Sequence, residues 1–469
     1  MKQQLPHDPD PQGQAPGLKD ILRRLPSVIG EAVKGKAADI ADSSKLREDR
    51  VPLDWNEASA RTVAAEIEDL LRRGPAARAL LEGSWSEQDL ALAEEIALAT
   101  SRAGSSNITR TEAYLACYQA YPELQWAFLA HMVSRNAGWN MTDLRGRLAD
   151  LLDENDKRSF YRFLERSNAL IFQDAYPQLM LYMKSRELGS SQFHLLPFFH
   201  VSRFMRPFWE RFWIDRGSAL LTVGLIINEQ NYIEKRVMRH PYYQKYAADK
   251  ASFHLNSLAG LNQIVFPLWE EAADGDEESG PPQASEGGDR AGGRRVRRLA
   301  GRVVSDFGSL ADRIALGKGL YAMLMGLRAV KSGAQRFADR VPHSGSRADY
   351  WPELFTANKE EALTSPVQGS ELLEGETLPL DARLYSPKLL DAWGDTPYEP
   401  ITREDWLRDH SALDGISAPQ PPYLCDISRE HRGGILKAAL AHDVAAGGSG
   451  AGNADGGLGG GGDDGGGEL

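Results

Sequence analysis

The sequence contains only two cysteines, Cys117 and Cys425, which stand far apart in the chain. This excludes a disulfide framework, a Cys-x-x-Cys redox motif and a thiolate zinc site, and it favours a reducing compartment. Long hydrophobic runs are also missing, because the longest, residues 219–227, is about half the length that a membrane-spanning helix needs. The polar, proline-rich start lacks the apolar stretch of a secretion signal. We therefore expect a cytoplasmic protein without a transmembrane segment.

The chain has fewer basic than acidic residues. The chain has 54 Lys and Arg residues against 66 Asp and Glu residues, which gives a formal net charge of −12. A nucleic-acid-binding protein uses a basic surface to displace counterions from phosphate, so nucleic acid is not an expected partner. Hydrophobic residues make up 42% and charged residues 26%, which are ordinary values for a globular protein.

Motifs for metal, nucleotide and nucleophilic chemistry are absent as well. No His-Glu-x-x-His or Glu-x-x-His pattern is present, so each histidine is interpreted as a structural hydrogen-bonding residue and no metal is predicted. There is no Gly-x-Ser-x-Gly elbow and no glycine-rich phosphate loop, and no cofactor is predicted. Motifs alone therefore do not decide whether the chain is an enzyme.

Apolar residues at helical spacing dominate what is present, and alternating strand patterns are hard to find. Ser84 with Glu87, and Thr109 with Glu112, have the spacing of a capping box and predict two helix starts. We expect a mostly α, multi-helix globular domain with an irregular C-terminal segment that wraps around it.

The composition changes along the chain and divides it into segments. These are an N-terminal arm that is partly disordered (1–50), a helical core (51–270), a disordered insertion that is acidic and then basic (271–298), a loop-rich continuation of the helical domain (299–412) and a flexible tail (413–469) that is rich in Gly and Asp from residue 447. The arm contains an amphipathic stretch with nearby lysines and arginines, which either packs on the domain as a short helix or lies on an anionic membrane surface. The arginines at the end of the insertion, up to Arg298, are expected to be solvated.

Polar side chains on apolar helix faces are the main functional signal. His131 and Arg135 share one face of a helix, and a turn is predicted at Gly138 before Asn140 and Asp143. A buried arginine needs a carboxylate or several carbonyl groups, because an unpaired charge in the interior costs several kcal/mol. We expect its partner to be Asp143 or one of the two carboxylates described next.

Two further polar groups interrupt apolar helices. Asp174 lies just before Pro177, which predicts a helix junction where the carboxylate caps the next turn. Glu229 and Asn231 directly follow the apolar stretch 218–227 without a helix breaker. Such side chains must pair with other polar groups or line a wet cavity.

The remaining candidates belong to two short stretches. They are His194, His200 and Arg203, around a proline, and His343, Arg347 and Asp349, in a turn-like stretch. Arg135, Arg203 and Arg347 would suit a small anionic ligand that binds a guanidinium in bidentate fashion. The alternative, which the sequence favours slightly, is a network of buried ion pairs that fixes the helix register.

Five segments carry a resemblance to a known family: 107–144, 163–182, 193–213, 219–237 and 342–351. They resemble an uncharacterised bacterial family, the YppC-like domain of unknown function. The resemblance implies a bacterial, cytoplasmic protein, and it implies no activity and no catalytic residue.

Three functions remain open. The leading hypothesis is a helical binding or scaffold protein whose polar pocket lies where residues 122–143, 160–176, 194–214 and 218–238 meet. The alternative is an enzyme that uses this pocket for acid–base chemistry on a small anionic substrate. The second alternative is a peripheral membrane-surface protein that attaches through its N-terminal arm. Both pocket hypotheses require His131, Arg135, Asp174 and Glu229 to converge on one cavity.

Overall fold

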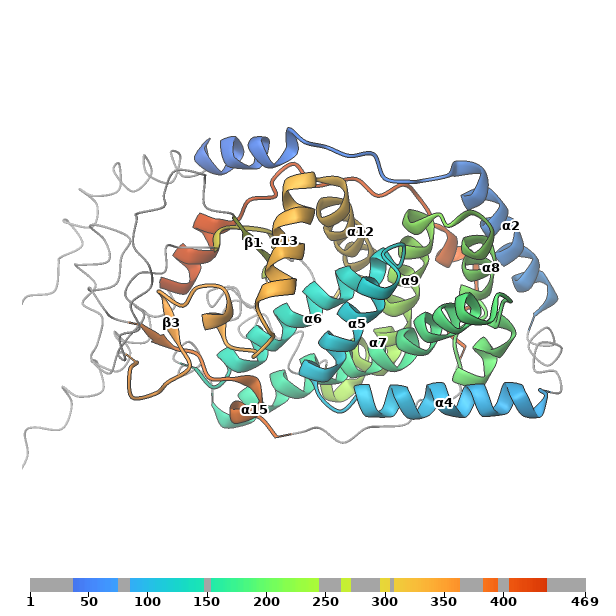
Figure 1. Ribbon diagram of the computed structural model, residues 1–469, viewed down its shortest axis with the longest axis horizontal. Helices are drawn as coiled ribbons and strands as arrows, with labels where there is room; N and C mark the ends of the chain where they lie inside the picture. The colour runs from blue at the N-terminus through green and yellow to red at the C-terminus, as the bar shows by residue number, and fades with distance from the viewer. Residues whose placement is uncertain are drawn as a thin grey trace, which may run out of the picture.

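The computed structural model describes residues 37–74, 85–146, 153–243, 263–270, 296–303, 308–362, 383–394 and 405–436. The fold is mostly α, as the sequence predicts (Figure 1). The α-helices are α2 (Glu57–Arg73), α4 (Glu87–Ala103), α5 (Asn107–Ala120), α6 (Gln125–Asp143), α7 (Glu154–Leu188), α8 (Met205–Asp215), α9 (Ser218–Ile233), α12 (Leu310–Gly326), α13 (Arg328–Arg340) and α15 (Leu389–Ala392). The other elements are the 3-10 turns η2 (Phe193–Phe199), η4 (Arg347–Asp349) and η5 (His410–Leu413), the π-turn η3 (Glu234–Met238), and the strands β1 (Gln263–Trp269), β2 (Val296–Val303), β3 (Phe355–Thr356) and β4 (Leu384–Tyr385).

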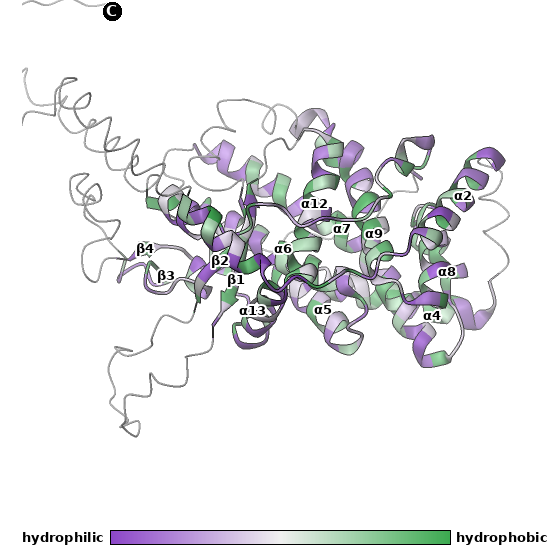
Figure 2. Cartoon of the chain, turned by 90° about the horizontal axis from the view of Figure 1, so that it is seen from above, coloured by the Kyte–Doolittle hydropathy of each residue, from purple (hydrophilic) through white to green (hydrophobic). Residues whose placement is uncertain are grey.

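Helix α6 forms the centre of the structure. Figure 1 shows α2, α8 and α4 at one end and β1 and β3 at the other, with α5, α6, α7 and α9 between them. Helix α6 contacts α5, α7, α9, α12 and β1, and nearly all of its residues are buried. An outer helix such as α2 carries both hydrophobic and hydrophilic residues (Figure 2), because only one of its faces is buried.

The capping boxes exist, but within one helical turn of the predicted positions. Helix α4 begins after Ser86, whose hydroxyl accepts from the backbone N–H of Asp89 while the Asp89 carboxylate accepts from the N–H of Ser86. Helix α5 begins after Ser106, which is paired in the same way with Thr109. The predicted boxes at Ser84–Glu87 and Thr109–Glu112 are therefore wrong, because a nearby Ser with Asp or Thr fills the same role.

The turn predicted at Gly138 is also wrong. Helix α6 continues through this residue to Asp143. A Cβ atom at Gly138 would lie 2.5 Å from Nε2 of His343 and 2.7 Å from Oδ1 of Asn107. The glycine is needed because another segment approaches the helix at this point, and it does not end the helix.

Helix α7 runs through Pro177, where the sequence predicts a helix junction. Asp174 therefore lies inside the helix and caps nothing. Proline in a helix interior costs about 3 kcal/mol. Phe172, Leu179 and Leu181 are fully buried on either side of it, and each such side chain stabilises the fold by roughly 1.5–3 kcal/mol. Packing therefore outweighs the local cost.

A pair of antiparallel strands was not predicted. Strands β1 and β2 are antiparallel, and their pairing runs from Gln263 opposite Val303 to Trp269 opposite Val296. Strand β1 shows no alternation of polar and apolar residues because it is buried on both faces, between α13 and α6. The other edge of β2 is extended by residues 425–427, where the N–H of Ile427 donates to the carbonyl of Leu299 at 3.0 Å.

These contacts change two of the predicted boundaries. The end of the expected insertion lies in β2, where Nε of Arg298 donates to Asp426 at 3.0 Å, so Arg298 is not a freely solvated linker residue. Residues 413–436, assigned to the flexible tail, are attached to the domain: Gly415 and Ser417 accept from Lys318 of α12, 425–427 pair with β2, and 428–436 are helical. The amphipathic part of the arm and the rest of the insertion lie outside the described residues.

Within the described residues, no helix is both long and apolar enough to cross a membrane. Residues 37–47 form a helix whose Leu46 is buried, and the strand-like segment that follows pairs with the junction between α12 and α13. The described part of the arm is thus attached to the domain.

Replacing Gly138 with alanine tests the close approach at α6. Gly138→Ala should lower the free energy of unfolding by about 1–3 kcal/mol, because the added methyl group must displace His343 or Asn107. The control is Gly434→Ala in the 428–436 helix, where a Cβ meets nothing within 4 Å. Alanine favours a helix over glycine, so the control should gain up to about 1 kcal/mol. Equal effects of both variants in urea unfolding would contradict the close approach.

Candidate functional site

The candidate residues do not gather in one place. Asn140, Asp143 and Arg347 share one network, and His131, Arg135, His343 and Asp349 share a second that adjoins it. Asp174 belongs to a third network, Glu229 borders a cavity, and His194, His200, Arg203 and Asn231 lie elsewhere. We take these places in turn.

The first network is centred on the ion pair between Arg347 and Asp143. Nε of Arg347 lies 2.8 Å from both carboxylate oxygens, and one of its terminal nitrogens lies 2.6 Å from Oδ2. The same guanidinium donates to Oδ1 of Asn140 at 3.2 Å. Burial alone would lower the pKa of Arg347, but the adjacent Asp143 raises it above its ordinary value. Burial also raises the pKa of Asp143, and Arg347 opposes this shift. The short bidentate contacts identify the two groups as a buried ion pair.

The same guanidinium reaches two residues that the sequence analysis missed. Its other terminal nitrogen contacts the hydroxyl of Tyr350 and lies 3.0 Å from Nε2 of His431. Nδ1 of His431 lies 2.6 Å from Oε1 of Gln263, an acceptor, so Nδ1 carries the proton and Nε2 accepts from Arg347. Burial lowers the pKa of His431 and keeps the imidazole neutral. The network thus joins α6, η4, β1 and the 428–436 helix.

The second network pairs Arg135 with groups that were not predicted, and leaves its Nε without a hydrogen-bond partner. Arg135 donates to the carbonyl of Val341 at 2.7 Å, lies 3.9 Å from the carboxylate of Asp349, and stacks over the ring of Phe337. The expectation that Asp143, or the carboxylate in α7 or α9, would pair with it is wrong. Asp349 also accepts from the indole of Trp139 at 3.2 Å. The interior charge is therefore matched locally.

Two histidines extend the second network as neutral groups. His343 lies 2.9 Å from Oδ1 of Asn107, and His131 lies 2.8 Å from the carbonyl of Thr111. Burial lowers the pKa of His131 to about 3 and that of His343 to about 4. Both histidines act as structural hydrogen-bonding residues.

The third network surrounds Asp174. Its Oδ2 accepts from the side-chain amides of Asn228 and Gln178, while Oδ1 is buried without a hydrogen-bond partner. Trp209 donates to Gln178 and Trp406 donates to Asn228, both at 2.8 Å. Burial raises the pKa of Asp174 to about 7. This carboxyl group therefore gains and loses its proton near neutral pH, and not at the acidic pH that is usual for an aspartate.

The four remaining candidate residues lie at separate places in the structure. His194 is exposed and lies 2.8 Å from Asp89, and His200 ends η2 with a positive φ of 58°. Arg203 donates to the carbonyl of Gly74, and Asn231 donates to the carbonyl one turn before it in α9. None of the four lines the cavity described next.

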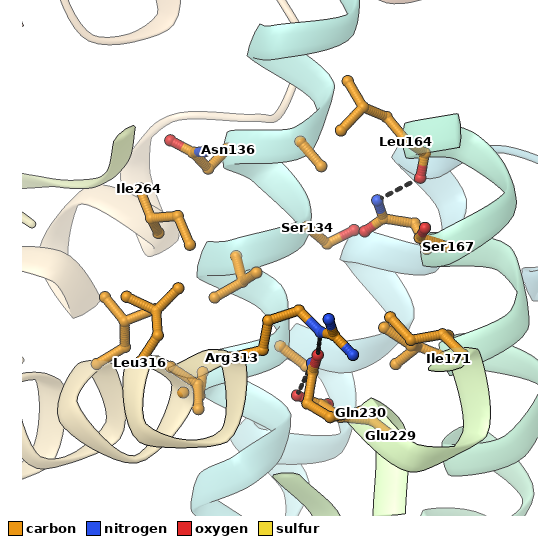
Figure 3. A pocket seen from close by; sticks show the side chains of 18 of the residues that line it. Ser134, Asn136, Leu164, Ser167, Ile171, Glu229, Gln230, Ile264, Arg313 and Leu316 are labelled. Atoms are coloured by element: carbon orange, nitrogen blue, oxygen red, sulfur yellow. Dashed lines mark hydrogen bonds between the residues drawn. The ribbon is translucent and has the colours of Figure 1, made fainter. Parts of the chain in front are cut away.

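A cavity of about 200 Å³ lies between α6, α7, α9, α12 and β1 (Figure 3). Of the candidates, only Asn140 and Glu229 line it, and α12 and β1 take the place of the predicted 194–214 segment. Its wall is mainly apolar. The apolar lining residues include Trp126, Leu129, Ala130, Val133, Ala137, Phe163, Leu164, Ile171, Ile233, Met238, Ile264, Leu316 and Leu320.

The charged groups on the cavity wall compensate one another. Arg313 donates to Gln230 at 2.9 Å and forms an ion pair with Glu234 (Figure 3 shows the bond to Gln230). Gln230 in turn donates to Oε1 of Glu229 at 3.2 Å. Burial raises the pKa of Glu229 to about 8, although hydrogen bonds from Gln230 and Trp126 oppose the shift. Burial thus favours the uncharged form of this carboxyl group, and the charge of Arg313 is neutralised by Glu234.

The hydroxyl of Tyr114 is the unusual group at this cavity. Tyr114 lines the cavity from α5, its hydroxyl oxygen is buried, and that oxygen has no hydrogen-bond partner. The ring is fixed by edge-on contacts with Trp126 and Phe172. An unsatisfied buried donor costs about 1–3 kcal/mol, so such groups are rare without a reason. The sequence gives no signal for Tyr114 beyond its place on a helix.

The described residues include neither a metal-binding cluster nor a reactive thiol. No group of three His, Cys, Asp or Glu side chains there is arranged to hold a metal ion. Cys117 and Cys425 are free and buried, and burial raises the pKa of Cys117 to about 12. Its thiol is therefore protonated at neutral pH.

Comparison with known proteins gives a family but no activity. The family described as "Protein of unknown function (DUF2515)" matches residues 103–422. The "Uncharacterized protein YppC" of Bacillus subtilis (strain 168) is 39% identical over 251 residues, which are 53% of this chain and 70% of that protein. No solved structure matches the chain significantly. The YppC-like resemblance of the sequence is confirmed.

Removing the charge of Asp143 tests the first network. Asp143→Asn keeps the shape of the side chain but leaves Arg347 buried and unpaired. We expect the free energy of unfolding to fall by about 3–5 kcal/mol in urea titrations. Glu154→Gln, which removes the exposed partner of Arg145, is the control and should have no measurable effect. A similarly small effect of Asp143→Asn would contradict the analysis.

The raised pKa of Asp174 predicts a pH dependence of stability. The unfolded chain releases this proton near pH 4, whereas the folded protein keeps it up to about pH 7. The folded state binds more protons in this range, so this group makes stability fall as pH rises. Relative to wild type, Asp174→Asn should gain about 2 kcal/mol in unfolding free energy between about pH 5 and pH 7. Parallel stability curves of the two proteins would rule out the raised pKa.

Proposed function

We propose a ligand-binding function for this chain, which belongs to the DUF2515 family of proteins of unknown function. The ligand is a small, uncharged and mainly apolar molecule that occupies the cavity between α6, α7, α9, α12 and β1. Every described residue that lines this cavity falls inside the segment that the family matches.

The size and lining of the cavity carry this proposal. Protein interiors are packed as densely as organic crystals and contain few voids larger than a water molecule. A concave, partly solvent-open pocket of about 200 Å³ with mainly apolar walls stands out from this packing, and such pockets are the usual sites of small-molecule binding. An engineered apolar cavity of about 150 Å³ takes up benzene. A substituted benzene, or an aliphatic molecule of that size, would fit here.

The charges around the cavity favour an uncharged ligand. The anionic ligand expected from the sequence depended on Arg135, Arg203 and Arg347, and these donate to carbonyl groups and carboxylates within the protein. Arg313, at the wall, is paired with Glu234. An anion would meet no uncompensated positive charge from these four residues, and burial would cost it its hydration.

Acid–base catalysis is the second candidate function, and Glu229 is the observation that favours it. A carboxyl group with a pKa of about 8 beside an apolar cavity can act as a general acid near neutral pH.

The cytoplasm remains the proposed compartment, in keeping with the two free cysteines. The membrane-surface alternative depends on a segment outside the described residues and gains no support.

Toluene tests whether the cavity binds ligands. At ten times its Kd, a ligand that binds only the folded state stabilises it by about 1.4 kcal/mol, which raises the Tm by a few degrees. Ala130→Leu places a larger side chain in the cavity from α6 and should abolish this rise. Ala97→Leu on the exposed face of α4 is the matched control and should retain it.

Benzoate provides the charged comparison. The proposal predicts that benzoate raises the Tm less than toluene does. A larger rise with benzoate would instead support the small anionic ligand expected from the sequence. No rise with toluene in the wild type, or an equal rise in Ala130→Leu, would contradict binding in the cavity.

A further inference from the structure

We propose that the ligand in the cavity carries a hydroxyl group, which donates a hydrogen bond to the side-chain oxygen of Asn168. This inference rests on the binding function proposed above and names the chemical class of the ligand. The class is that of small phenols and of alcohols with an apolar body.

The amide side chains on the cavity wall are the observation that carries this inference. The described lining residues include four of them: Asn136, Asn140, Asn168 and Gln230. The oxygen of Asn136 accepts from the backbone of β1 at 3.0 Å, and that of Asn140 accepts from Arg347 at 3.2 Å. The oxygen of Gln230 accepts from Arg313 at 2.9 Å. The oxygen of Asn168, in contrast, accepts no hydrogen bond from any described residue.

The orientation of the Asn168 amide is fixed by its own helix. Its nitrogen donates to the carbonyl of Leu164, one turn earlier in α7, at 2.8 Å (Figure 3 shows this bond). The nitrogen therefore faces that carbonyl, and the oxygen points away from it. The side chain is only partly buried, and its oxygen, unlike the hydroxyl of Tyr114, is not enclosed by protein atoms. A molecule in the cavity can therefore reach this oxygen.

The neighbouring side chains of α7 give this part of the wall an amphipathic character. Leu164 and Ile171 lie about one turn before and after Asn168 on the same face of the helix, and both line the cavity. Ser167 also lines the cavity, and its hydroxyl proton is used in a bond to the carbonyl of Phe163 at 2.8 Å. The wall thus presents oxygen acceptors between apolar side chains.

A hydroxyl group suits this acceptor better than other neutral groups do. A hydrocarbon that displaced water from Asn168 would leave the amide oxygen unsatisfied, which lowers the affinity of the hydrocarbon. A ketone or an ether would place one acceptor against another. A hydroxyl group supplies the missing proton, and it brings no charge whose burial would cost hydration.

Phenol and toluene are matched probes, because they differ in a hydroxyl group that replaces a methyl group, and phenol is uncharged near pH 7. Asn168→Leu keeps the approximate size of the side chain and removes the acceptor. Leucine favours a helix, so the variant should fold. Calorimetric titration of the full chain should show that this variant binds phenol about fivefold more weakly than the wild type does, as expected for one neutral hydrogen bond. Its affinity for toluene should be unchanged or higher.

Asn231→Leu is the matched control. Asn231 makes the same bond to the carbonyl one turn before it, but it does so in α9 and away from the cavity. This substitution should leave the affinities for phenol and toluene unchanged. Asn168→Ala is a second variant without the acceptor, and it should weaken phenol relative to toluene in the same way as Asn168→Leu.

Anisole separates the hydroxyl proton from the oxygen atom of the probe, because a methyl group replaces the proton. Anisole should bind Asn168→Leu no more weakly than it binds the wild type. A loss of anisole affinity in this variant as large as the loss of phenol affinity would show that no hydroxyl proton is recognised, and it would overturn the inference.

The remaining outcomes distinguish the two proposals. If neither phenol nor toluene binds the wild type, the binding function fails, and this inference fails with it. If toluene binds but phenol does not, or if both Asn168 variants bind phenol as tightly as the wild type does, binding stands and the hydroxyl site is overturned. An equal loss of phenol affinity in Asn231→Leu would overturn it as well.

Discussion

A polar helix buried at the centre of the protein constrains the rest of the fold. Helix α6 lies inside the structure along nearly its whole length and carries polar groups on several sides. Pairing these groups where they lie is strongly favoured, because an unsatisfied polar group in the interior is costly. The side-chain amide of Asn107, on α5, donates to the carbonyl of Ser134. The side-chain amide of Asn136 forms two hydrogen bonds with the backbone of β1, and Asp143 forms an ion pair with Arg347. The packing of these neighbours follows from those pairings.

The charged side chains of the networks are paired with other groups of the protein, so they are not available to bind a ligand. The cavity is therefore the better candidate for a binding site. The side chains that looked functional in the sequence, such as Arg135, Arg347 and His131, are occupied by carbonyl groups and carboxylates of the protein itself. The cavity differs from them because its wall is mainly apolar. A binding function therefore depends on the contrast between the polar networks, whose charged groups are paired within the protein, and a mainly apolar cavity.

The sequence was sufficient for the fold class, the family and the presence of polar groups on apolar helix faces. Helical spacing shows which residues share a face, but it does not show what faces them. Hence the partner of Arg135 was missed, and so was His431, which reaches Arg347 from a stretch assigned to the tail. Gly138 and Pro177 predicted breaks because local propensity was judged without the packing that overrides it. Of the candidates, Asn140 and Glu229 do line the cavity.

Xenon is the most direct probe of the central claim, because it enters apolar cavities without needing hydrogen bonds. A crystal of the full chain under xenon pressure should show xenon between α6, α7, α9 and α12, and the same site should be empty in Ala130→Leu. A cavity that takes up no xenon in the wild type, or xenon that remains in the variant, would contradict the account.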